Sequence, residues 1–244
     1  MIATHLKPGW RWRRLAWRRK PCIIAVFSFR YDHHLVPDLI ANIEPMVDGW
    51  VSFDDRQASQ VFSSEPERRR QLVAAAAGLG ADYILGIDPD ERLERRAARR
   101  MRELTENGQG RAFSFRLREL YGPDFYRVDG VWGRKRQFRL FPAFAPEAPR
   151  GPELHGRWFP DSIAGVNTGL NLYHLKMISP RRRLLRRDLY KYLDPESRHQ
   201  RIGYDYLADE TGAEFEAIPA GRGYGPAHVE DGGSWMPELP ATNA

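Results

Sequence analysis

The feature that most constrains the fold of this chain is a short apolar run that ends abruptly in three carboxylates. The run covers residues 83–87, and Asp88, Asp90 and Glu91 follow it at once. Its length and composition are typical of a buried strand, which has to end at Pro89 because proline has no backbone N–H group. In extended backbone, side chains two positions apart point the same way, so Asp88 and Asp90 can converge on one cation. Because Mg²⁺ and Mn²⁺ prefer oxygen ligands, we expect both aspartates to bind one of these metals.

Two further apolar runs, residues 22–29 and 49–53, precede this one and are also typical of strands. Helical stretches separate the three runs, one over residues 37–45 and one over residues 64–77. Strands that alternate with helices in this way form right-handed crossovers and build a parallel sheet. The sequence therefore predicts an α/β fold, in which ligands bind outside the carboxyl ends of the strands.

Polar side chains follow the first two strands at the edge where the acidic cluster is expected. Ser28 and Arg30 end the first strand, and Asp54 and Asp55 end the second. Agreement across three strand ends indicates a nucleotide site, and we expect these four residues to contact the nucleotide. Downstream, the guanidinium of Arg139 is suited to pair with a diphosphate through two parallel hydrogen bonds.

These segments carry a resemblance to a known family. Residues 88–93 (DPDERL) are similar to the D-A-D-E-R-L signature of a bacterial branch of glycosyltransferase family 2, which has the GT-A fold. Shorter matches follow in the same order at residues 139–141 (RLF), 154–156 (LHG) and 173–175 (YHL), and the resemblance covers residues 21–195. It implies a nucleotide-binding parallel half followed by a mixed-sheet acceptor half.

The resemblance also implies an activity. A metal-dependent enzyme of this kind transfers a sugar from a nucleotide-diphosphate sugar to a hydroxyl group, with inversion at the anomeric carbon. The resemblance does not specify the acceptor, which can be a glycan, a lipid-linked molecule or a small molecule. Mn²⁺ or Mg²⁺ would stabilise the departing diphosphate, and the resemblance implies His174 as a third metal ligand.

The group that removes the acceptor proton is left open. The family branch has a glutamate after its first downstream histidine, where this chain has Gly156. Glu91, His155 and Asp161 are the candidate catalytic residues, and Glu153 is chemically able to do the same work.

The positive charge of the chain is concentrated at its N-terminus. Of 38 basic residues, seven lie in residues 1–20, which hold no acid; the other 224 residues therefore carry 31 basic against 32 acidic groups. The nearly neutral remainder argues against a nucleic-acid partner. Residues 1–20 also hold three of the seven tryptophans, so we interpret them as a tail suited to an anionic membrane surface. A leader without function is the alternative.

The rest of the chain completes one domain over residues 21–212. A single cysteine excludes an internal disulfide. The sequence also has no apolar run long enough to span a bilayer, which favours a cytoplasmic location. Peripheral attachment to the inner membrane face is an option. We expect little regular structure in the glycine- and proline-rich residues 213–244. The remaining patterns predict strands over residues 111–118, 137–141 and 169–175, helices over 92–106, 179–193 and 199–210, and an ordered loop over 142–160.

Two other functions compete with sugar transfer. One is a binding protein on an inactive transferase scaffold, and the other is a phosphatase of the haloacid dehalogenase type. Such phosphatases also use Asp-x-Asp after a strand, but there the pair normally follows the first strand, whereas here it follows the third. Metal-dependent binding of a uridine or guanosine diphosphate distinguishes sugar transfer, which requires it, from the inactive binding protein, which does not.

Overall fold

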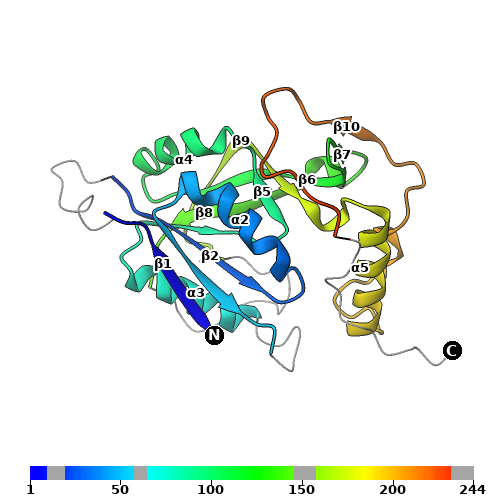
Figure 1. The fold of residues 1–244 in the computed structure, drawn as a ribbon, viewed down its shortest axis with the longest axis horizontal. Helices are drawn as coiled ribbons and strands as arrows, with labels where there is room; N and C mark the ends of the chain where they lie inside the picture. The colour runs from blue at the N-terminus through cyan, green and yellow to red at the C-terminus, as the bar shows by residue number, and fades with distance from the viewer. Residues whose placement is uncertain (10–19, 58–64, 146–157, 232–244) are drawn as a thin grey trace.

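The computed structural model describes residues 1–9, 20–57, 65–145 and 158–231 (Figure 1). These residues form a mixed α/β fold around a large mixed sheet, which confirms the predicted α/β class. None of the helices in these ranges is both long enough and apolar enough to cross a membrane. The strands are β1 Ile2–Leu6, β2 Ile23–Phe29, β3 Gly49–Asp54, β4 Tyr83–Gly86, β5 Glu91–Leu93, β6 Ala112–Gly122, β7 Phe125–Arg127, β8 Arg136–Pro142, β9 Gly165–His174 and β10 Phe215–Ala217. The α-helices are α2 Val36–Ile43, α3 Glu65–Gly78, α4 Ala97–Glu106 and α5 Pro180–Leu193.

The three strands predicted first along the chain pair in parallel, and β6 and β9 form a second parallel pair. β2 lies between β3 and β4 and is parallel to both, with Ile24 opposite Gly49 and Ile23 opposite Tyr83. The strand order is β1-β3-β2-β4-β8-β6-β7-β10, and β9 pairs with β6 and β5. The carboxyl ends of β2, β3 and β4 therefore meet at one edge of the sheet, as the sequence predicts.

Alternation along β2 places helices on both faces of the sheet. Ile23, Ala25 and Phe27 belong to the apolar cluster that includes α2 and α4. Ile24 and Val26 belong to the cluster that includes α3. Successive side chains of a strand point to opposite faces, so one fully apolar strand can support both layers.

The N-terminus differs from the prediction. Residues 2–6 form β1, which pairs antiparallel with β3 and places Ile2 opposite Phe53. The ring of His5 also stacks on that of Trp50, with centroids 4.1 Å apart. Backbone pairing therefore joins this strand to the sheet, although it lies on the tail side of the boundary expected after residue 20. Residues 10–19, which hold most of the tryptophan and arginine cluster, lie outside the described residues.

The helix predicted over residues 92–106 begins later, at Ala97. Residues 91–93 instead form β5, which pairs with β9 and places Leu93 opposite Leu172. The side chain of Asn42 accepts a hydrogen bond from the Leu93 N–H at 2.8 Å and donates one to the Leu93 carbonyl at 3.0 Å. These contacts come from residues far away in the sequence, and they override the local helical pattern.

The helix predicted over residues 199–210 is also absent, since the described chain forms turns there and only the 3-10 helix η5 (Asp205–Leu207). The carboxylate of Asp194 accepts hydrogen bonds from the N–H groups of Arg198 and His199 and from the hydroxyl of Tyr204. A side chain thus takes the place of the backbone carbonyls that a helix would supply.

The C-terminal segment, defined here as residues 213–231, belongs to the domain. Its strand β10 pairs antiparallel with β7. Further along, Arg222 binds the fully buried carboxylate of Glu94 at 2.9 and 2.7 Å, and the ring of Tyr224 packs on that of Tyr173. These contacts cross the boundary expected at residue 212, and most of the segment has no regular secondary structure, as expected.

The pair between Arg222 and Glu94 provides a test of this assignment. Arg222→Met leaves the buried carboxylate of Glu94 without its cation, and we expect a loss of about 3 kcal/mol in the free energy of unfolding. As a control, Arg198→Met removes an exposed ion pair with Glu196, and we expect a change within about 0.5 kcal/mol. Urea denaturation measures both; equal effects would show that the C-terminal segment does not contribute to the folded domain.

Candidate functional site

A cavity of about 820 Å³ lies at the carboxyl ends of the parallel strands. Its walls combine the end of β2, the turn over residues 88–91 after β4, the start of α3, parts of β6 and β8, and α5. In Figure 1, α5 lies beyond the arrowhead of β2. The cavity therefore occupies the place where the sequence predicts a ligand.

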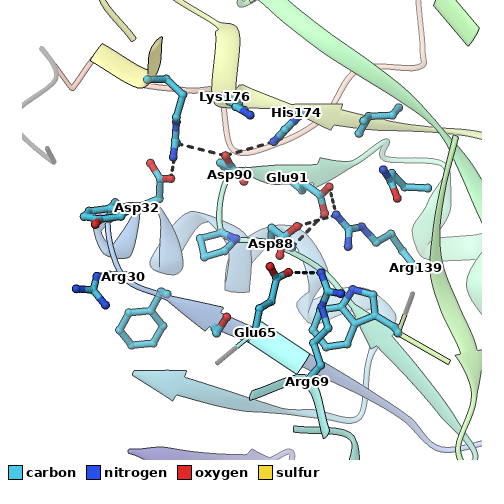
Figure 2. Close-up of a pocket in the computed structure, with 18 of the residues that line it drawn as sticks. Arg30, Asp32, Glu65, Arg69, Asp88, Asp90, Glu91, Arg139, His174 and Lys176 are labelled. Atoms are coloured by element: carbon cyan, nitrogen blue, oxygen red, sulfur yellow. Dashed lines mark hydrogen bonds and ion pairs between the residues drawn. The ribbon is translucent and has the colours of Figure 1, made fainter. Parts of the chain in front are cut away.

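Asp88 projects into this cavity from the turn after β4 (Figure 2). Its side chain is 45% exposed, and Arg139 of β8 donates a hydrogen bond to its carboxylate at 2.7 Å. Arg139 also binds Glu91, which is buried and accepts a hydrogen bond from the Asp88 N–H at 3.1 Å. The sequence placed Arg139 and Asp88 in one site, and the structure brings them together.

Glu91 has a different position from that expected of a catalytic base. Burial raises the pKa of its carboxyl, although the Arg139 cation acts in the opposite direction. Its oxygens are bound by Arg139 and by the backbone of Asp88. In this arrangement Glu91 holds the turn and the guanidinium in place.

Asp90 points away from Asp88, towards the opposite wall of the cavity (Figure 2). Its carboxylate lies 3.3 Å from Nε2 of His174 and 3.7 Å from Arg186. Nδ1 of His174 lies 2.8 Å from the buried carboxylate of Glu119. Burial acts to lower the pKa of His174, but the Glu119 and Asp90 carboxylates outweigh this effect and raise it well above 6.5. Both ring nitrogens of His174 are therefore in use, and the raised pKa favours its charged form.

The ion pairs continue behind Asp90 into α5. Arg186 and Arg182 each donate a hydrogen bond to Asp32, at 2.7 and 2.8 Å. Arg182 also binds Asp231 of the C-terminal segment. A continuous series of buried charges thus connects that segment to Asp90.

The predicted nucleotide contacts divide into two groups. Ser28, Arg30 and Asp55 line the cavity, and Asp55 is buried against Arg68 at 2.9 Å. Asp54 is not among the lining residues and instead forms a solvent-accessible pair with Arg56. The order of the two aspartates in the sequence does not reveal which one faces the cavity, because the chain turns between them.

Of the other catalytic candidates, Asp161 is exposed in a turn and is not among the residues that line the cavity. His155 and Glu153 lie outside the described residues, as does most of the predicted loop over residues 142–160.

The predicted metal ligands do not form a cluster. Among the described residues, no three or more His, Cys, Asp and Glu side chains form a group suited to a metal ion. The two nitrogens of His174 are engaged, and Asp90 is bound by cations. Asp88 is exposed to the cavity and offers carboxylate oxygen. That donor fits Mg²⁺ or Mn²⁺, which are commonly bound by one or two carboxylates together with substrate phosphates.

Sequence analysis missed several residues of the site. Glu119 and Asp32 pair with His174 and Arg186, but neither has a sequence motif that would identify it. Lys176 lines the cavity two positions after His174, and Tyr190 comes from α5. The arginine-rich composition of α5 was the one available signal, since charged residues on a helix that packs against the domain need partners.

In comparisons with known proteins, no family model and no curated protein matches this sequence. The resemblance to glycosyltransferase family 2 therefore stays a prediction from its motifs. What can be concluded about function rests on the cavity and the residues that line it.

The raised pKa of His174 predicts how stability depends on pH. Its ion pairs stabilise the fold fully below the unfolded-state pKa near 6.5, and this stabilisation is lost as pH rises through the higher folded-state pKa. Glu119→Gln removes one carboxylate, so we expect the histidine to lose its proton at lower pH. NMR titration of the imidazole measures this shift, with Glu103→Gln, a half-buried carboxylate on α4, as control. A His174 pKa that Glu119→Gln leaves unchanged would contradict the assigned pairing.

Proposed function

We propose that the protein is a glycosyltransferase that binds a nucleotide-diphosphate sugar in the cavity and transfers the sugar to a hydroxyl acceptor with inversion. The position of Asp88 carries the proposal. It is an exposed carboxylate next to Arg139, at the carboxyl end of a parallel strand, in a large cavity. This is the edge at which nucleotides bind in parallel α/β sheets.

The lining residues support one orientation of the donor. Phe29 and Asp55 line the cavity at the ends of β2 and β3, where they can contact the nucleoside. Asp88 and Arg139 lie at the end of β4 and on β8, next along the sheet. A donor that follows the sheet edge would place its nucleoside at Phe29 and its diphosphate at Asp88.

Arg139 supplies a further argument for a phosphate ligand. Its side chain is buried, and its Nε has no hydrogen-bond partner among the described residues. A buried donor without a partner costs free energy, and a small shift that exposes this atom to the cavity would let a phosphate oxygen satisfy it. Negative charge grows on the departing diphosphate during sugar transfer, so a fixed guanidinium stabilises the transition state.

Asp88 is the residue that would hold the metal, together with the diphosphate. Bound there, Mn²⁺ or Mg²⁺ would neutralise charge on the leaving group. The ion pairs of Asp90 keep that carboxylate buried, so Asp90 acts by holding the turn that carries Asp88. Replacement of Asp90 would therefore disturb the fold as well as the ligand.

A binding protein without transferase activity is the second candidate, and one observation favours it. Every described carboxylate that lines the cavity has a cationic partner; the pairs are Asp32 with Arg182 and Arg186, Asp55 with Arg68, Glu65 with Arg69, Asp88 and Glu91 with Arg139, Asp90 with His174, and Glu119 with Lys135 and His174. No unpaired carboxylate base is thus available among them. Release of nucleoside diphosphate from a bound donor, with or without an acceptor, distinguishes an enzyme from a binding protein.

Asp88→Asn tests the diphosphate site. We expect affinity for uridine or guanosine diphosphate in the presence of Mn²⁺ to fall about tenfold or more, because a charged ligand is removed. Asp161→Asn serves as the matched control, since Asp161 is exposed and lies off the cavity wall. Isothermal titration calorimetry measures both. Wild-type protein that binds neither nucleotide would contradict the proposed function, and unchanged affinity in Asp88→Asn would contradict the role of Asp88.

Asp55 and Asp54 form a second matched pair. Asp55→Ala should weaken nucleotide binding to a similar extent with and without Mn²⁺, because Asp55 lies at the nucleoside end of the cavity. Asp54→Ala should leave the affinity unchanged, because Asp54 faces Arg56 in solvent. The same titrations provide the readout. If the loss in Asp55→Ala appears only when Mn²⁺ is present, the assigned orientation of the donor is wrong.

A further inference from the structure

The cavity wall on the far side of Asp90 contains a lysine that forms no ion pair with any described carboxylate. Lys176 lies in the 3-10 helix η4 (Leu175–Met177) directly after β9 and lines the cavity. In the view of Figure 2, Asp90 lies between Lys176 and Asp88. Tyr190 and Leu193 of α5 and Tyr206 of η5 line the same cavity.

The carboxylates of this wall already have other partners among the described residues. Asp32 binds Arg182 and Arg186, and Asp90 lies near His174 and Arg186. Glu119 lies near His174 and Lys135, and Asp231 binds Arg182 and lies near His34. Lys176 is in none of these pairs.

Lys176 is half-buried, and no ion pair among the described residues includes it. Its ammonium lies 4.6 Å from the centre of the Tyr190 ring. A cation–π contact offsets part of the cost of burying an ammonium group, but less than an anionic partner would. The side chains of Lys176 and Tyr190 also share a hydrogen bond. An ammonium group has three N–H donors, so an anion in the cavity would add a charged partner that Tyr190 does not supply.

Neutral hydrogen-bonding groups accompany this cation. The hydroxyl of Tyr206 accepts a hydrogen bond from the side chain of Gln200 at 3.3 Å, so its own proton is available to a ligand. The ring of Tyr190 packs on that of Tyr204 with centroids 5.3 Å apart, and Trp132 packs against Tyr206. Buried aromatic neighbours thus hold both tyrosines of the cavity wall.

We infer that this end of the cavity is an acceptor subsite for an anionic molecule, with Lys176 bound to its phosphate or carboxylate group. The inference rests on the proposed function, because it assigns the opposite end of the cavity to the donor. It specifies an acidic acceptor, and a phosphate can be part of a soluble sugar phosphate or of a lipid headgroup.

Glucose 6-phosphate, with glucose as the neutral analogue, tests the inference on the full chain. Calorimetry is run with uridine diphosphate and Mn²⁺ present, so that the donor site is filled, and again without them. We expect glucose 6-phosphate to bind at least about tenfold more tightly than glucose, without displacing the nucleotide. Glucose bound as tightly as glucose 6-phosphate, or displacement of the nucleotide, would overturn the inference.

Substitutions locate the binding. Lys176→Met should weaken binding of glucose 6-phosphate about tenfold or more, and Lys176→Arg should restore most of it. Lys191→Met is the matched control, because Lys191 lies on α5 in an exposed pair with Asp205. Thermal unfolding confirms that each variant is folded. Unchanged affinity in folded Lys176→Met would overturn the inference, and the comparison of the two sugars in wild-type protein tests it independently of any variant.

Vesicles distinguish the two sources of the phosphate. Equimolar phosphatidylcholine and phosphatidic acid provide a lipid phosphate, and phosphatidylcholine alone provides the control. If the protein binds the acidic vesicles, and Lys176→Met weakens this binding, a lipid-linked acceptor is supported. If the protein binds glucose 6-phosphate but not the vesicles, a soluble acceptor is supported. Failure of both probes overturns the inference. Absence of nucleotide binding, by contrast, contradicts the proposed function, while the anion subsite is still measured by the titrations without nucleotide.

Discussion

The buried carboxylate of Asp90 and its two cations determine the shape of the cavity. His174 from the end of β9 and Arg186 from α5 both contact it, so three segments distant in the sequence meet at one charge. Burial of any of these groups alone would cost several kcal/mol. The ion pairs continue from His174 to Glu119 and from Arg186 to Asp32. Because Arg186 lies on α5 and Asp90 lies in the turn that carries Asp88, the position of α5 depends on that turn.

The two aspartates of the Asp-x-Asp sequence thus have different roles in the structure. Asp88 is exposed and faces the cavity, while Asp90 is buried and joins the walls. Their shared direction in ideal extended backbone does not persist, because Pro89 ends the strand and the chain turns before β5 begins at Glu91. A motif defined by spacing identified the location of the site, but the turn decided which oxygen atoms a ligand can contact.

The C-terminal segment shows how a sequence without regular secondary structure becomes part of a domain. Arg222 neutralises Glu94, Tyr224 packs on Tyr173, and Asp231 binds Arg182 behind the cavity. Side-chain partners at intervals replace the backbone hydrogen bonds of a helix or strand. Through Asp231, the end of this segment belongs to the same ion pairs as Asp90.

The sequence by itself determined the parallel strands, the helices between them and the edge at which Asp88 and Arg139 lie, because these follow from local apolar runs and from proline and glycine positions. It did not determine that residues 2–6 and 91–93 are strands, since their pairing partners are distant in the chain. The choice of Asp55 over Asp54 at the cavity also came only from the tertiary structure, as did the position of Lys176 outside the ion pairs of the described residues. Whether a charged group is paired depends on neighbours that folding brings together from distant parts of the chain. The spacing of residues in the sequence does not predict which neighbours these are.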